Sequence, residues 1–175
     1  TNMKTMNLTL LTNEDISTKP YAAPEPVATP DKSYEYVVNS TADAGSGTLR
    51  DALNHLETNT TITFDTSVFS PKNPGVILLE SELPEINMDY LTIDASNAGV
   101  ILDGSLLSEG NGMNIYSSHC KIMGMQILNF PGNGIQADGS WNQFGGSRAI
   151  GDGPLGQGNL LSGNGICGIV TGGWY

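Results

Sequence analysis

The sequence predicts an all-β fold, a right-handed parallel β-helix of a little over four coils with one N-terminal capping α-helix. Two observations predict it: a glycine-rich composition and a repeat built of short apolar strands. The chain has 175 residues and 22 glycines, and each glycine inside a helix would cost roughly 1 kcal/mol. A mostly helical protein is therefore excluded, and many short strands separated by turns are expected.

Asn-Gly pairs mark the repeat. They occur at 111–112, 133–134 and 164–165, so the intervals are 22 residues (133 − 111) and 31 residues (164 − 133). The longer interval equals the shorter one plus an insertion of nine residues (31 − 22), which we place in the glycine-rich stretch at about 147–157. Short strands that recur at such a period are typical of a solenoid, in which each coil buries its apolar face against its neighbours.

Alignment of the coils stacks similar residues in columns. One column holds Ile62, Ile93, Ile122 and Phe144, and a second holds Ile77, Ile101, Ile127 and either Leu160 or Leu161. A third column is expected to hold the strands at 37–38, 83–86, 112–115, 134–137 and 166–170. Coils of a parallel β-helix lie about 4.8 Å apart, and their inward side chains form ladders. The predicted core ladder is taken from the first two columns and consists of Ile62, Ile93, Ile122, Phe144, Ile77, Ile101 and Ile127.

Residues 48–57 form the expected helix. Thr48 and Asp51 resemble a capping box, and one apolar stripe follows at helical spacing, made of Leu49, Ala52, Leu53 and Leu56. We expect this stripe to cover the N-terminal end of the core, because an open end exposes apolar side chains and unpaired backbone groups. At the other end the sequence stops at Trp174-Tyr175. Three readings stay open there: these aromatics fold back, the polypeptide continues, or another subunit stacks.

The chain divides into two parts. Residues 1–33 are predicted to be an extended N-terminal tail and Pro-rich linker, with four prolines between 20 and 30. Residues 34–175 are predicted to form the β-helix domain. A strand at 7–12 suggests an arm that pairs with the sheet edge of a neighbouring subunit. The alternative is that the whole tail is disordered.

The charge balance excludes some partners. The formal net charge is −11, with 7 basic and 18 acidic residues, so the chain cannot neutralise a run of nucleic-acid phosphates. No apolar run approaches the roughly 18 residues that a membrane span needs. No signal peptide is recognisable, which predicts a mature chain or a fragment. Cys120 and Cys167 are expected to lie on different coils, too far apart for a disulfide, and to remain free thiols.

Several stretches are similar to a known group. They are 37–40 with 45–53, 61–65, 91–96, 100–105, and 142–146 with 158–164. Over about residues 36–170 the sequence resembles the opening of large bacterial right-handed parallel β-helix surface proteins, which share the pectate-lyase-like superfamily fold. The resemblance implies the β-helix architecture, a secreted or surface-attached location, and an adhesive or structural role.

Catalytic residues do not cluster in this sequence. Related β-helix enzymes cleave acidic polysaccharides with grouped carboxylates, or with calcium and a basic residue, whereas Asp94 and Asp103 are expected on different faces. Trp141, Arg148 and Asp152 are the candidate carbohydrate contacts, because indole stacks on sugar rings and guanidinium pairs with acidic ones. The alternative is a plain loop with an Arg148–Asp152 ion pair, and we favour it because one loop offers no convergent set.

Calcium is suggested by Gly151-Asp152-Gly153, but the calcium-binding nonapeptide repeat is missing, so no metal or cofactor is expected. We expect a non-catalytic extracellular or cell-surface structural or adhesive module. It would self-assemble through its N-terminal arm and open C-terminal end, with other copies of itself or a longer surface assembly as partners. The alternative is a protein that binds or cleaves polysaccharide.

Overall fold

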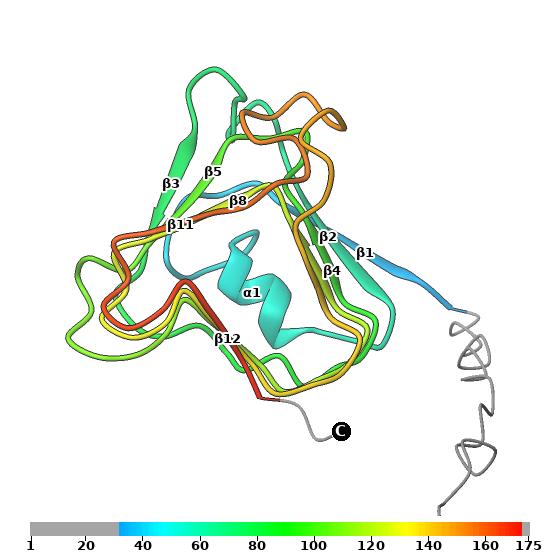
Figure 1. Ribbon diagram of the computed structural model, residues 1–175. Helices are drawn as coiled ribbons and strands as arrows, with labels where there is room; N and C mark the ends of the chain where they lie inside the picture. The colour runs from blue at the N-terminus through cyan, green and yellow to red at the C-terminus, as the bar shows by residue number, and fades with distance from the viewer. Residues whose placement is uncertain (1–31, 173–175) are drawn as a thin grey trace, which may run out of the picture.

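The computed structural model describes residues 32–172. Nearly all of the predicted tail, including the strand at 7–12, lies outside the described residues, as does Trp174-Tyr175. The described chain is a parallel β-solenoid of about four turns with one short helix, which confirms the predicted fold class. Viewed along its axis, the coils superimpose on a three-sided outline (Figure 1).

Three parallel sheets form the three sides. The first contains β1 (Tyr34–Val38), β2 (Thr60–Phe64), β4 (Thr92–Asp94), β7 (Lys121–Met123) and β10 (Gln143–Phe144). The second contains β3 (Gly75–Leu78), β5 (Val100–Asp103), β8 (Met125–Leu128) and β11 (Leu160–Ser162). The third contains β6 (Met113–Ile115), β9 (Ile135–Ala137) and β12 (Ile169–Thr171).

Alternation along each strand decides which residues face the axis. In β2 the buried positions are Thr60, Ile62 and Phe64. Ile62 pairs with Ile93, Ile93 with Ile122, and Ile122 with Phe144, which is the first column that the coil alignment predicts. The three isoleucines of this column have no exposed surface. Stacked aliphatic side chains therefore form the dry axis of the solenoid.

Ile101 was predicted in the second column, and this prediction is wrong. Ile77 pairs with Leu102, and Leu102 pairs with Ile127, whereas Ile101 pairs with Val76 on the outward side. Val100-Ile101-Leu102 is an unbroken apolar run, so its sequence lacks the alternation that would fix which residue points inward. The column continues from Ile127 to Leu161, not to Leu160.

The predicted place of the first strand is also wrong. β1 pairs with β2 in the first sheet, and not with the strands of the third column. The expected strand at 83–86 is reduced to one bridge, between Ile86 and Ile115. β1 stands at the end of the strand order of that sheet, beside β2, so it forms the N-terminal edge of the sheet.

The insertion lies between β10 and β11, where the sequence placed it, but its length differs. Ile135 pairs with Ile169, so this coil spans 34 residues (169 − 135), which exceeds the 22-residue coil by 12 (34 − 22). The third Asn-Gly pair is therefore out of register with the first two. The Asn164 side chain donates to the Ile127 carbonyl and accepts from the Phe130 amide. Asn164 lies three positions before Cys167, which is the residue that the register aligns with Asn133.

The helix α1 (Leu49–Asn54) is shorter than the predicted span of 48–57. Thr48 is its N-cap, and the Thr48 side chain accepts a hydrogen bond from the Asp51 amide at 3.1 Å. Leu49, Ala52 and Leu53 are buried in the core, and Leu56, beyond the helix end, packs against it. Figure 1 shows α1 inside the outline of the coils. The helix thus closes the N-terminal end.

Arg50 fastens this helix to the first coil. Its guanidinium pairs with the Asp43 carboxylate at 2.6 Å, with both side chains about 15% exposed. The same group donates to the carbonyls of Ser81 at 2.7 Å and Glu82 at 2.5 Å. Arg50 lies outside the apolar stripe of the helix, so the helical pattern does not predict these contacts. Arg suits the role because its planar fork serves several acceptors at once.

Candidate functional site

The last coil leaves its inward side chains uncovered. We call Phe144, Leu161 and Ile169 the terminal rung, because each is the last described member of its column. Phe144 and Leu161 are half-buried and Ile169 is 37% exposed. One coil earlier, their partners Ile122, Ile127 and Ile135 are each 0% exposed. Among residues 32–172, nothing covers this rung as α1 covers the first one.

The strands of this coil are also edges. β10, β11 and β12 each end the order of their sheet, so one side of each lacks a strand partner within the described part of the chain. Ile166, between β11 and β12, is 70% exposed. An apolar end with unpaired strand edges on all three sides is a ready template for further β-structure.

Three asparagines attach the last coil to the one before it. Asn142 accepts from the Cys120 amide at 2.8 Å and donates to the Ser117 carbonyl at 2.9 Å. Asn159 accepts from the Met125 amide and donates to the Ile122 carbonyl. Asn164 accepts from the Phe130 amide and donates to the Ile127 carbonyl. These amides pair buried donors and acceptors that the turns leave free. Asn142 and Asn159 directly precede β10 and β11, and this placement was the one visible signal of their role in the sequence.

One buried asparagine side chain in the described chain has an oxygen without a hydrogen-bond partner. Asn111 Oδ1 accepts from the Asn133 amide at 2.7 Å, and Asn133 is its equivalent in the next coil. Asn133 is buried, yet its Oδ1 has no hydrogen-bond partner. The register places Cys167 at the position that would donate to it. The ladder of amides is therefore incomplete at the last coil.

A second feature lies at the corner that leads into the first sheet. The corner column, defined here as Asn59, Tyr90, His119 and Trp141, occupies equivalent positions in four coils. All four have positive φ values, between 61° and 67°. The Tyr90 and His119 rings are stacked at 4.7 Å and 3°, and the His119 and Trp141 rings at 6.5 Å and 7°. Trp141 is 64% exposed.

The three candidate carbohydrate contacts do not converge. Trp141 lies in the turn before β10, whereas Arg148 and Asp152 lie in the insertion after it. The insertion folds onto the turn between β4 and β5, where the Asp152 amide donates to Asn97 Oδ1 at 3.1 Å. Arg148 and Asp152 form no ion pair within the described chain, since its salt bridges involve other residues.

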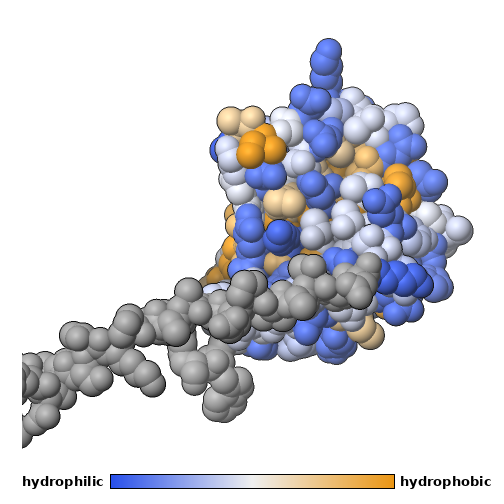
Figure 2. Space-filling view, turned by 90° about the vertical axis from the view of Figure 1, so that its right-hand side faces the viewer, coloured by the Kyte–Doolittle hydropathy of each residue, from blue (hydrophilic) through white to orange (hydrophobic). Residues whose placement is uncertain are grey.

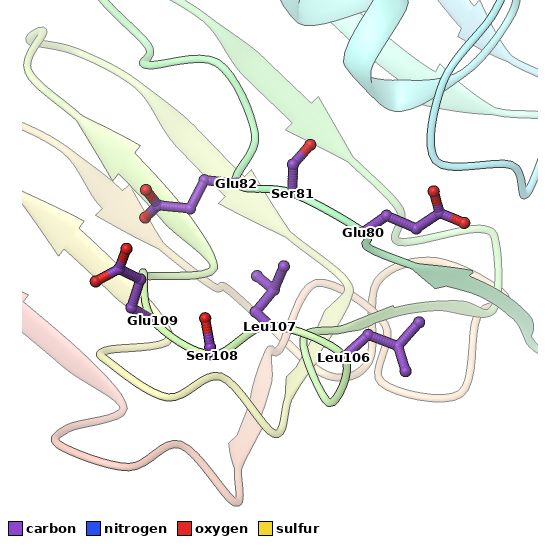
Figure 3. Close-up of a pocket in the computed structure, with 7 residues that line it drawn as sticks. All are labelled: Glu80, Ser81, Glu82, Leu106, Leu107, Ser108 and Glu109. Atoms are coloured by element: carbon purple, nitrogen blue, oxygen red, sulfur yellow. The ribbon is translucent and has the colours of Figure 1, made fainter.

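A shallow acidic cleft lies between two loops on another side. Figure 3 shows its lining, which consists of Glu80, Ser81, Glu82, Leu106, Leu107, Ser108 and Glu109. One Glu82 oxygen already accepts from the Asn111 amide at 2.9 Å. No group of three or more His, Cys, Asp or Glu side chains within residues 32–172 is arranged to hold a metal ion. Glu82 and Glu109 lie at one end of the cleft and Glu80 lies at the other (Figure 3).

The Asp94 and Asp103 carboxylates lie on different sides of the solenoid, as the sequence predicts. Asp94 ends β4 and Asp103 ends β5, in different sheets. Asp103 instead accepts from the Ser105 amide at 2.9 Å within its own turn. Both cysteines are free: Cys120 is buried and Cys167 is exposed. Burial raises the pKa of the Cys120 thiol, so this group stays protonated and unreactive.

No family model matches the chain, and neither a curated protein nor a solved structure matches it significantly. Within the described range, no helix is long and apolar enough to cross a membrane. The face that carries β1, β2 and β4 is mostly hydrophilic, with a few separate hydrophobic residues (Figure 2).

Proposed function

We propose that the protein is a non-catalytic structural module of an extracellular or cell-surface assembly. In this proposal the terminal rung is a joining surface for another copy of the chain. The observation that carries it is the asymmetry of the two ends: α1 buries the first rung, while Phe144, Leu161 and Ile169 stay partly exposed.

The geometry favours contact between two C-terminal ends. α1 occupies the N-terminal end, so a second copy cannot stack head-to-tail without displacing Leu49 and Leu53 from the core. Two C-terminal ends facing one another make a self-complementary contact with two-fold symmetry. Each copy then buries the terminal rung of the other, at about 25 cal/mol per Å² of apolar surface removed from water. The predicted N-terminal arm lies outside the described residues and is a separate route to assembly.

Three properties support a structural role at a surface. The net charge of −11 disfavours binding to nucleic acid. The Asp94 and Asp103 carboxylates lie in different sheets, too dispersed for paired acid–base work. The sequence also resembles bacterial surface proteins of the pectate-lyase-like superfamily, and membership in that group is part of this proposal. Polysaccharide cleavage has no comparable support.

Light scattering at increasing protein concentration tests the joining surface. We expect the mass to rise to that of a dimer, and the variants Leu161→Lys and Ile166→Lys to remain monomeric. Leu106→Lys is the matched control, because Leu106 is an exposed leucine away from the C-terminal coil. Ile166 is itself highly exposed, so its replacement leaves the fold intact. A monomer at all concentrations, or a dimer unaffected by both variants, contradicts the proposal.

A further inference from the structure

We propose that the N-terminal tail of each chain docks on the outside of its own second sheet, with the leucines of residues 7–12 as the contact. The outward side chains of β3, β5, β8 and β11 form this surface, which we call the aliphatic outer face. It is one side of the three-sided outline (Figure 1), and its central strands β5 and β8 are paired on both edges. This docking goes beyond the proposed function and uses none of the terminal rung.

The strand register defines the aliphatic outer face. Two columns of side chains point outward, namely Val76, Ile101, Gln126 and Leu160 in the first, and Leu78, Asp103, Leu128 and Ser162 in the second. Five of these eight side chains are aliphatic. Val76 is 44% exposed, Leu78 40% and Leu160 42%, while Ile101 and Leu128 are half-buried. The apolar surface therefore extends over all four strands.

The outsides of the other two sheets are mostly polar. The third sheet presents Asn114, Gln136 and Val170. The first sheet presents one column of Glu35, Thr61, Thr92, Lys121 and Gln143, and another of Val37, Thr63, Asp94 and Met123. The same coils build all three sides, so the solenoid itself does not require an aliphatic outside. A group of exposed apolar side chains on one sheet marks an interaction surface.

The area of this surface is too small for a second copy. Strands lie about 4.8 Å apart and residues about 3.3 Å apart, so four strands of four residues cover roughly 19 by 13 Å, or about 250 Å². A stable interface between two proteins buries about 800 Å² on each partner. An extended segment of six residues is about 20 Å long and spans all four strands. The aliphatic outer face therefore suits one short segment.

Residues 7–12 have the matching chemistry. They read Asn-Leu-Thr-Leu-Leu-Thr, which includes every leucine that precedes the described residues and no charged residue. In an extended segment Leu8 and Leu10 share one side. The one charged side chain of the aliphatic outer face is Asp103, and it already accepts a hydrogen bond from the Ser105 amide at 2.9 Å. The face thus calls for an uncharged aliphatic occupant.

The linker is long enough for docking within one chain. The Lys32 carbonyl accepts a hydrogen bond from the Asn59 side chain at 3.1 Å, at the corner that leads into the first sheet. The 19 residues of 13–31 (31 − 12) extend to about 59 Å at about 3.1 Å per residue. A coil of 22 residues (135 − 113) measures at most about 73 Å around, so every side lies within about 37 Å along the surface.

The same linker favours the chain's own sheet over a neighbour's. A tether of this kind holds the segment at an effective concentration of about millimolar. A second copy in a dilute sample is present at a far lower concentration. Docking within one chain is therefore the alternative to the arm that pairs with a neighbouring subunit.

Methyl NMR of the full chain tests the docking. We expect cross-peaks between the methyl groups of Leu8 or Leu10 and those of Ile101, with each signal assigned by substitution. A second sample mixes chains labelled only on leucine with chains labelled only on isoleucine. The cross-peaks should vanish in this sample, because the contact lies within one chain.

Variants of the surface separate docking from folding. Val76→Thr combined with Ile101→Thr makes the face polar with side chains that favour strands, and it should remove the cross-peaks between Leu8 or Leu10 and Leu128. Val37→Thr is the matched control, because Val37 is 53% exposed on the outside of the first sheet. It should leave those cross-peaks unchanged.

Variants of the tail complete the test. Leu8→Ser combined with Leu10→Ser should shift the methyl signals of Ile101 and Leu128 and leave those of Val37 in place. The methyl signals of Leu102, which is fully buried, report that the fold is intact in every variant.

Three results would overturn the proposal. The first is a full chain without cross-peaks between the tail leucines and the aliphatic outer face. The second is cross-peaks that persist in the mixed sample, which would assign the occupant to the tail of a second copy. The third is an Ile101 signal that follows protein concentration after Leu8 and Leu10 are replaced, which would assign the face to a second copy. Leu161→Lys and Ile166→Lys test the joining surface and should not change the cross-peaks, so the two proposals fail independently.

Discussion

Leu102 lies directly between Ile77 and Ile127 in the solenoid core, while its neighbour Ile101 lies between Val76 and Gln126 on the outer side. Leu102 has no exposed surface, and Ile101 is half-buried. Two adjacent aliphatic residues thus have opposite environments, and the register of the second sheet is set by the leucine.

This pair gives the first prediction. Leu102→Ala should lower the free energy of unfolding by about 2–5 kcal/mol, because it removes buried methyl groups and leaves a cavity. Ile101→Ala, the matched control, should cost less than about 1.5 kcal/mol, because its side chain already meets water. Chemical denaturation of both variants measures the difference. Equal costs, or a larger cost for Ile101→Ala, would mean that the register is wrong.

The second prediction concerns the amide at the corner of the last coil. Asn142→Ala leaves the Cys120 amide and the Ser117 carbonyl without partners, and each such loss costs about 1–3 kcal/mol. Gln143→Ala is the control, because the Gln143 side chain is exposed and donates to the nearby Gly145 carbonyl within its own turn. Thermal unfolding should show a clear drop in midpoint for Asn142→Ala and little change for Gln143→Ala. A stable Asn142→Ala variant would refute the structural role of this amide.

The third prediction uses the two thiols. In the native protein one thiol per chain should react quickly with a maleimide, and this thiol should be Cys167. Cys120 should react only after unfolding, because it is buried and burial raises its pKa. Mass spectrometry of the labelled protein gives the site and the rate. Rapid labelling of Cys120 in folded Cys167→Ser protein would contradict its inward position.

The fourth prediction concerns the Tyr36–Asp51 hydrogen bond beside the helix cap. This bond, together with the Gly47 amide, lowers the pKa of Asp51 below its ordinary value of 3.8. The stabilisation is therefore present above that ordinary value, and it is lost as the pH falls through the folded pKa. The same bond, with burial, raises the pKa of Tyr36 above 10.0. That contribution is present below this value and is lost as the pH rises further.

Tyr36→Phe removes the bond and should flatten the stability profile at both ends. We expect its free energy of unfolding to change less than that of the native chain below about pH 4 and above about pH 10. Tyr34→Phe is the control below about pH 4, because Tyr34 lies on the same strand and contacts Lys32 rather than Asp51. Unfolding by urea across this pH range makes the measurement. Parallel profiles for the native chain and Tyr36→Phe would refute the coupling.

Much of the fold could be predicted from the sequence, because each coil of a solenoid needs apolar residues at the same inward positions. Alternation in 60–64 and the similar residues at Ile93 and Ile122 specify an inward column. Register could not be predicted where alternation fails, as at Val100-Ile101-Leu102. The third Asn-Gly pair misled for a related reason: turn residues recur wherever the chain bends, so equal dipeptides need not be equal positions.

The candidate site was less predictable. Trp141, Arg148 and Asp152 are close in sequence, but β10 separates the first from the other two. The corner column joins residues 29 apart (119 − 90) and 22 apart (141 − 119), and its signal is a shared backbone conformation rather than a motif. The clamp of Arg50 depends on carbonyls more than 30 residues away. Such contacts follow from the register, which must be known first.

Hydrogen exchange at two protein concentrations tests the central claim most directly, because it reports on the strands of the last coil themselves. If the terminal rung joins two copies, amides of β11 and β12 should become more protected as concentration rises. Those of β4, already paired on both sides, should not change. Protection of β11 and β12 that stays low and constant, while β4 stays protected, would contradict the account.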